Sequence, residues 1–181
     1  MSMELLSAPY LGRDRGGFYD DSGVRRAYAH ELRGIVLFLP YMAVVDAFQH
    51  WVYAEAPEDA SPADLDAKWT SLWDRFMPGV DYGGLQTQKE TGWHRKGHIF
   101  ESPFYYIEYG LAQLGALQVW RNALRHGNAK AVVDYRSALA LGYTRSLPEL
   151  FQAAGARFAF DRQTVGELMA LIQEQLSELE K

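Results

Sequence analysis

Apolar residues recur every three or four positions along most of this chain, which is the spacing of one face of an α-helix. The clearest case follows Asp161, where a single face carries Val165, Leu168, Ile172, Leu176 and Leu179. The alternating pattern typical of strands is almost absent. No internal repeat or low-complexity tract divides the chain. The pattern therefore predicts an all-α fold, organised as one helical region over residues 1–181.

Serine–proline pairs predict the start of two helices. A serine hydroxyl accepts a hydrogen bond from the first turn, and proline fits the first helical position. Ser61-Pro62 predicts a helix that ends near Met77-Pro78, and Ser102-Pro103 predicts one that runs to His126 before Gly127. Further helices are expected over residues 24–54, with Pro40 either kinking or dividing the segment, over 129–141, and from the capping pair Ser146 and Glu149.

The connection 79–97 interrupts the helical pattern. It contains five glycines, including Gly83 and Gly84, and has no helical period. Unstructured loops of this length in compact domains are usually functional or mobile, although a tolerated surface insertion is the alternative. We favour a functional loop because it leads directly to His98.

Composition and charge exclude several classes of function. The net charge of −5 provides no basic surface for nucleic acid. The absence of cysteine excludes disulfides, thiolate nucleophiles and cysteine-ligated metals, and fits an intracellular setting. The longest apolar run, residues 35–45, is broken by Pro40 and is too short to span a bilayer. We therefore expect neither a nucleic-acid nor a membrane partner.

Two histidine patterns suggest a metal site only weakly. His30-Glu31 begins like the zinc motif H-E-x-x-H, but Gly34 stands where the second histidine is required. Asp46 and His50 are four residues apart and share a helix face, where a hydrogen-bonded structural pair is favoured over a metal pair.

His94 and His98 also have metal-pair spacing. However, Arg95 and Lys96 lie between them and would repel a divalent ion. His98 could instead donate a hydrogen bond to a ligand, or cap the following turn, and the sequence leaves both options open.

Three tyrosines follow His98. In a helix that starts at Ser102-Pro103, Tyr105 and Tyr109 would point to the same side, with Tyr106 displaced by about 100°. Judged by residue type alone, buried tyrosines with satisfied hydroxyls are more common than ligand contacts. Beyond them, a stripe of small residues permits close helix packing and consists of Ala112, Gly115 and Ala116.

Four segments together resemble the C-terminal part of oligoendopeptidase F, within the thimet-oligopeptidase-like family of zinc metallopeptidases. They are SMELLSAPYL at 2–11, PYMAVVDAFQHWVY at 40–53, HIFESPFYYIEYGLAQLGALQVW at 98–120 and LPELFQAAGARFAF at 147–160. The resemblance covers essentially the whole chain. It implies a mostly helical catalytic domain that lines a cleft for short peptides in a cytoplasmic enzyme.

The resemblance also implies roles for individual residues. His98, Tyr105 and Tyr109 match the family's catalytic histidine and tyrosines, which bind substrate and stabilise the oxyanion. Tyr106 would join them in substrate binding. The loop at 79–97 resembles the family's glycine-rich loop beside the active site, which makes Gly83 and Gly84 candidate substrate contacts.

The family's zinc ligands and general base are missing. In the family, zinc is held by both histidines of H-E-x-x-H and by a later glutamate, and all three precede the segment that matches residues 2–4. No such motif occurs in this sequence. We therefore expect a C-terminal fragment whose partner is the N-terminal portion carrying the zinc.

Such a fragment alone would bind no catalytic metal and cleave no peptide, and it would expose apolar surface around Leu5, Leu6 and residues 35–52. The alternative is a non-catalytic helical module that binds peptides or a partner chain.

Overall fold

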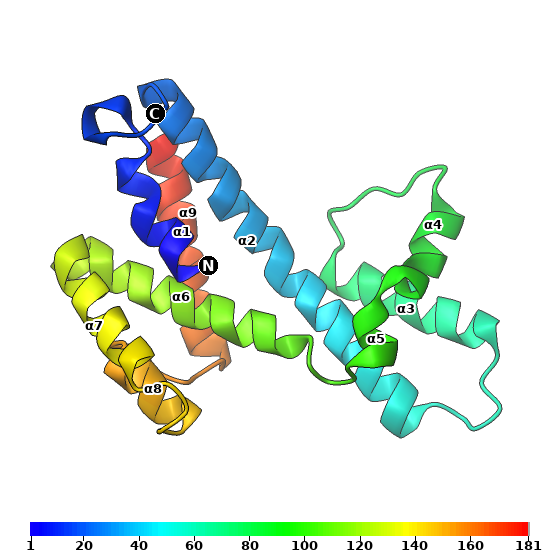
Figure 1. Ribbon diagram of the computed structural model, residues 1–181. Helices are drawn as coiled ribbons and strands as arrows, with labels where there is room; N and C mark the ends of the chain where they lie inside the picture. The colour runs from blue at the N-terminus through cyan, green and yellow to red at the C-terminus, as the bar shows by residue number, and fades with distance from the viewer. Residues whose placement is uncertain (181) are drawn as a thin grey trace. The chain divides into compact units, whose positions relative to one another are not determined.

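The computed structural model describes residues 1–180, and apart from one isolated bridge between Gly12 and Tyr19 all regular structure there is helical (Figure 1). The prediction of an all-α fold is confirmed. The α-helices are α1 (Ser2–Ser7), α2 (Asp21–His50), α3 (Pro62–Phe76), α4 (Gln86–Glu90), α5 (Gly97–Glu101), α6 (Ile107–His126), α7 (Asn128–Ala140), α8 (Leu147–Ala153) and α9 (Arg162–Leu179). Short 3₁₀ turns lie at Ala8–Tyr10, Arg13–Arg15 and Thr91–Arg95, and a π-helical turn, η3, spans Trp51–Glu55.

The helices belong to two compact units. Unit 1 comprises residues 1–34 together with the chain from Leu111 onward, and unit 2 comprises residues 35–110. Helices α2 and α6 each contribute residues to both units. All of the predicted site residues lie in unit 2.

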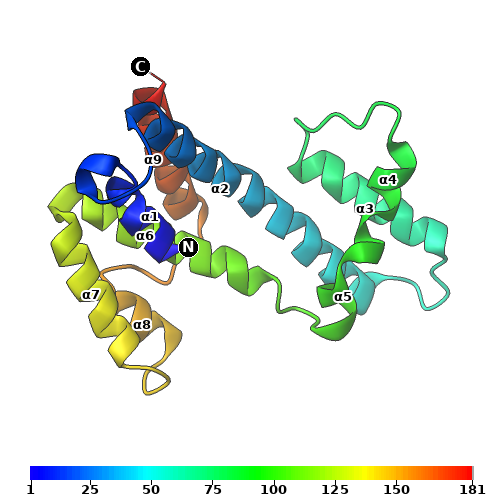
Figure 2. The same ribbon diagram turned by 45° about the horizontal axis from the view of Figure 1, so that its top comes forward.

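Unit 1 is built around helices with small side chains at their contacts. One of its core clusters joins Leu6 of α1 and Val119 of α6 to three alanines, which are Ala131, Ala138 and Ala154. Helices α7 and α8 lie side by side in both views (Figures 1 and 2). A Cβ atom at Gly115 would come within 2.7 Å of the Phe151 ring, so the predicted small-residue stripe does permit α8 to approach α6 closely.

Unit 2 has an aromatic core between the last part of α2 and α3. Val44, Val45 and Phe48 of α2 are fully buried and pack with Trp69 of α3 and Ile99 of α5. The rings of Phe48 and Trp69 meet edge to face, with centroids 5.2 Å apart. This core fixes α5, the helix that carries His98.

Helix α2 runs without a break through Pro40. Of the two alternatives for this segment, division into separate helices is thus wrong. Residues 21–55 are long and apolar enough to meet a membrane-span criterion, although the apolar run within them is short. Core helices of globular proteins can have the same length and composition, so this alone is weak evidence for a membrane span, and Val44 and Phe48 of α2 are buried in the core of unit 2.

Several predicted helix ends are confirmed. Ser61 caps α3: its hydroxyl accepts from the Asp64 N–H, while Asp64 accepts from the Ser61 backbone. At α8, the Glu149 carboxylate accepts hydrogen bonds from the N–H and the hydroxyl of Ser146, at 2.9 and 2.6 Å. Asp161 caps α9 by accepting from the Thr164 N–H at 3.0 Å.

Two expectations around the site are wrong. Ser102-Pro103 does not start a helix, because α6 begins at Ile107 and residues 102–106 form a loop. The connection 79–97 is not wholly unstructured either, since α4 and the turn Thr91–Arg95 occupy its second half. At Ser102-Pro103 a tertiary contact, the hydrogen bond from the Phe104 N–H to Gln49, overrides the local preference for a helix start.

The expected exposure of apolar surface is only partly correct. Leu5 and Leu6 are 1% and 6% exposed, so that part of the prediction is wrong. Val36 and Leu37 on α2 are exposed, as expected for the segment 35–52.

Candidate functional site

The structure brings the predicted histidine and tyrosines together in unit 2. His98 lies on α5, Tyr105 and Tyr106 lie in the loop that follows, and Tyr109 lies in the first turn of α6. The His98 ring centroid is 4.9 Å from that of Tyr106 and 5.9 Å from that of Tyr109. Tyr109 also meets Tyr105 at 5.8 Å and Tyr106 at 5.6 Å, both edge to face. We call these four residues the His–Tyr cluster.

The polar groups of the His–Tyr cluster remain available to a ligand. The hydrogen bonds recorded around it, from Tyr53 to Ile99 and from Phe104 to Gln49, use other groups. Tyr105 is 52% exposed, and His98, Tyr106 and Tyr109 are half-buried. Burial, with a smaller contribution from Tyr109, raises the pKa of Tyr106 above its ordinary value. Its hydroxyl therefore stays protonated and can donate a hydrogen bond.

Gln49 of α2 fixes the loop that carries Tyr105 and Tyr106. Its side chain is 0% exposed, and its Oε1 accepts a hydrogen bond of 2.9 Å from the Phe104 N–H. Phe104 has a φ of 62°, in the left-handed region that non-glycine residues seldom adopt. Such a conformation persists when the surrounding structure determines it, and residues of this kind cluster at functional sites. The turn before the tyrosines is thus held in one shape by a buried glutamine.

Aromatic contacts support the same loop. The Phe104 ring lies 5.0 Å from that of His50 and 5.6 Å from that of Tyr53. Tyr53 in η3 also donates to the carbonyl oxygen of Ile99 at 2.7 Å, which ties α5 to the end of α2.

The sequence interpretation did not identify Gln49, Tyr53 or Phe104. One signal was present: Gln49 lies four residues after Val45 and seven after Met42, on the apolar stripe of its helix. A polar residue at such a position must find a partner.

A cavity of about 430 Å³, a volume typical of sites that bind small ligands, opens beside His98 and Tyr106. Its lining consists of Arg95, Lys96, Gly97, His98, Glu101, Ser102 and Tyr106. Two members of the His–Tyr cluster thus face a space rich in hydrogen-bond donors.

Gly83 and Gly84 lie elsewhere in unit 2. They line a different cavity, of about 520 Å³, which is formed by residues 78–84 with Gln86 and Lys89. Gly84 has a φ of 75°, so the turn requires its conformational freedom. The structure does not place these glycines in the cavity that His98 lines, and their role in substrate binding stays a prediction.

The described residues contain no group of three histidine, aspartate or glutamate side chains able to hold a metal ion. The Asp46 Oδ2 and His50 Nε2 atoms are 3.7 Å apart, which is too long for the hydrogen bond expected of this pair. The His94 Nε2 atom lies 3.8 Å from the Asp66 Oδ1 atom, and His94 and His98 do not form part of such a group. The residues present do not fit a zinc ion.

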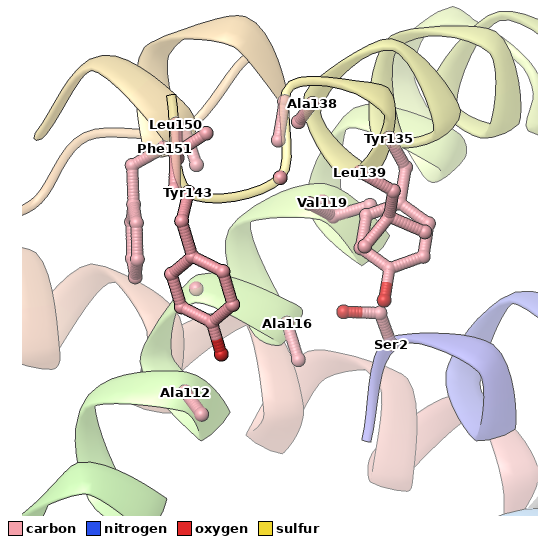
Figure 3. A pocket seen from close by; sticks show the side chains of 14 residues that line it. Ser2, Ala112, Ala116, Val119, Tyr135, Ala138, Leu139, Tyr143, Leu150 and Phe151 are labelled. Carbon is pink, nitrogen blue, oxygen red and sulfur yellow. The ribbon is translucent and has the colours of Figure 1, made fainter. Parts of the chain in front are cut away.

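A mainly apolar cavity lies in unit 1, and none of the predicted site residues lines it (Figure 3). Its volume is about 350 Å³, and Ala112 and Ala116 of α6 form one side. Phe151, Tyr143 and Tyr135 stand around it, with Ser2 at its edge. The small side chains of the stripe on α6 leave space for this cavity, and no charged side chain lines it.

The family model described as Peptidase family M3 matches residues 17–169, which include the whole His–Tyr cluster. That match covers most of the chain. The chain belongs to peptidase family M3.

Two solved structures resemble the chain over nearly all of its length. One, assigned as an oligoendopeptidase F, has 32% sequence identity and a TM-score of 0.82 over 97% of this chain. The other, PZ peptidase A with an inhibitor, has 30% identity and a TM-score of 0.85 over 98%. This family M3 chain spans only 30% of the length of each. No curated protein matches it.

Membership of family M3 relates the chain, by family, to metallopeptidases. The family is generally zinc-dependent, but residues 1–180 of this member supply no ligand set for zinc.

Proposed function

We propose that this chain is the C-terminal part of a zinc metallo-oligoendopeptidase and supplies residues that bind the peptide and stabilise the oxyanion. The observation that carries the proposal is the His–Tyr cluster itself, with the His98 ring 4.9 Å from Tyr106 and 5.9 Å from Tyr109. Family membership and the likeness to an oligoendopeptidase F support it.

The chemistry follows from the donors in the cluster. Attack of water on a peptide carbonyl places negative charge on its oxygen, and fixed donors stabilise that charge more than they stabilise the substrate. His98, Tyr105 and Tyr109 are the proposed donors, and Tyr106 together with Gly83 and Gly84 would contact the peptide. The edge-to-face packing within the cluster restricts each ring before substrate arrives.

The remaining requirements would come from the N-terminal portion of the peptidase. Zinc, when bound there, would activate the attacking water. The absence of cysteine from the sequence supports a cytoplasmic location. Alone, the chain would be inactive.

Complementation tests the proposal. We would mix the chain with an N-terminal portion carrying H-E-x-x-H, add zinc, and measure cleavage of a quenched fluorescent oligopeptide. We expect activity only in the mixture, and a loss of about 10²–10³-fold in kcat with His98→Ala or Tyr109→Phe. Binding of peptides without cleavage in any mixture would favour the alternative, a non-catalytic peptide-binding module.

A further inference from the structure

The cavity beside His98 has an excess of positive charge. Arg95 and Lys96 line it together with the donors His98, Ser102 and Tyr106, whereas Glu101 is the one acidic residue in the lining. Charges in the wall of a concave site raise the local concentration of a ligand of opposite sign.

Arg95 and Lys96 lack the acidic partner that Lys89, another cation of unit 2, has. Lys89 forms an ion pair with Asp74. For Arg95 and Lys96, no carboxylate oxygen lies within 4.0 Å in the part of the chain that the structure describes.

Lys96 is the more constrained of the two. Its Nζ lies 4.6 Å from the centroid of the Tyr41 ring, which holds the side chain in place by a cation–π contact. The residue is half-buried, and this burial lowers the pKa of its ammonium group. A ligand carboxylate would restore the interactions that burial removes.

We propose that this cavity is a binding subsite for a carboxylate of the peptide, with Lys96 as the main cation and Arg95 at its exposed edge. The inference rests on the proposed function, because it assumes that the His–Tyr cluster binds a peptide next to the subsite. The Ser102 and Tyr106 hydroxyls would complete the coordination of the carboxylate oxygens. The peptidase would then prefer peptides that end in, or carry, a carboxylate beside the scissile region.

Three peptides distinguish whether the subsite binds the C-terminal carboxylate of a peptide or the carboxylate of an acidic side chain. Binding to the full chain would be measured by NMR titration with acetyl-trialanine, with its C-terminal amide, and with acetyl-Ala-Asp-Ala-amide. We expect one carboxylate peptide to bind at least fivefold more tightly than the trialanine amide, and high salt to reduce that difference. The better of the two carboxylate peptides identifies the source.

Variants test the role of Lys96. Lys96→Gln should abolish the preference, and Lys68→Gln should preserve it, because Lys68 also lies over an aromatic ring but outside this cavity. Glu101→Gln should strengthen binding of the carboxylate peptide several-fold by removing a like charge, which is a gain that a folding defect cannot produce.

The outcomes separate this inference from the proposed function. Equal binding of all three peptides would overturn the carboxylate subsite and leave the peptide site intact. Failure of every peptide to bind would overturn both.

Discussion

Gln118 in unit 1 and Gln49 in unit 2 are both buried and hydrogen-bond to the backbone of a loop, but Gln118 uses both ends of its side-chain amide and Gln49 uses one. Gln118 in unit 1 is 0% exposed and uses both ends of its amide: its Nε2 donates to the Arg157 carbonyl and its Oε1 accepts from the Arg157 N–H, each at 2.9 Å. Gln49 in unit 2 is equally buried, yet only its Oε1 is bonded, to Phe104. Its Nε2 has no partner among the described residues.

Buried polar atoms without a partner in the described chain occur in both units, for example Gln49 Nε2 in unit 2 and Gln113 Nε2 in unit 1. What sets Gln49 apart is that its one hydrogen bond supports Phe104, a residue with left-handed backbone. Satisfied networks stabilise a fold, whereas unsatisfied groups and local strain are tolerated mainly where function requires a particular geometry. We infer that Gln118 serves stability and Gln49 serves the shape of the site.

Replacing Gln118 should give the largest change in stability. Gln118→Leu leaves the N–H and carbonyl of Arg157 without their partner, and we expect the free energy of unfolding to fall by about 2 kcal/mol. Chemical denaturation followed by circular dichroism measures it. The control is Gln163→Leu, at an exposed glutamine bonded only to Glu167, where a change within about 0.5 kcal/mol is expected. Equal losses of unfolding free energy in the two variants would show that the buried Gln118 contributes no more to stability than an exposed glutamine.

Gln49→Leu should have a smaller effect on stability and a larger one on the site. The Phe104 N–H loses its acceptor, but a buried unpaired amide nitrogen is removed at the same time, so the net change should lie within about 1 kcal/mol. The His–Tyr cluster should lose its arrangement, which the ring-current shift of the His98 Cε1 proton in NMR spectra reports. Gln86→Leu, at an exposed position of unit 2, should leave that shift unchanged. An unaltered His98 signal in Gln49→Leu would show that the loop does not depend on Gln49.

The contrast also explains which features the sequence could predict. Helices such as α3 and α9 were predictable because their caps, Ser61 and Asp161, bond within the first turn. The start of α6 was not, because residues 102–106 are shaped by a contact with Gln49, more than fifty positions earlier in the chain. The residues of the His–Tyr cluster stood out in the sequence as possible hydrogen-bond donors to a ligand, but their catalytic roles came from the resemblance, and their geometry depends on the same distant contact. Local signals therefore predicted the elements, and long-range hydrogen bonds determined the loop.

Backbone strain at Phe104 can be measured with two substitutions. Glycine adopts a positive φ freely, whereas alanine retains the strain and, like glycine, lacks the aromatic ring. We expect Phe104→Gly to be more stable than Phe104→Ala by about 1 kcal/mol, the reverse of their usual order. Thermal denaturation compares the two variants directly. Greater stability of the alanine variant would contradict the left-handed conformation.

The smallest expected effect is a difference in pH dependence between the two units. Burial is the main cause that raises the pKa of Asp46 above 3.8, whereas hydrogen bonds from Thr164 lower the pKa of Asp161 at the start of α9. A raised carboxyl pKa favours folding at low pH, and this contribution is lost as the pH rises through the pKa of the folded state. A lowered pKa favours folding above pH 3.8, and its contribution is lost as the pH falls.

Asp46→Asn should therefore be more stable relative to wild type at pH 7 than at pH 3. Asp161→Asn should be less stable relative to wild type at pH 7 than at pH 3. Both changes should be smaller than that of Gln118→Leu. Urea denaturation at the two pH values measures these changes. If the stability of both variants relative to wild type shifted in the same direction between pH 3 and pH 7, the pKa of Asp46 could not be raised by burial while that of Asp161 is lowered by capping.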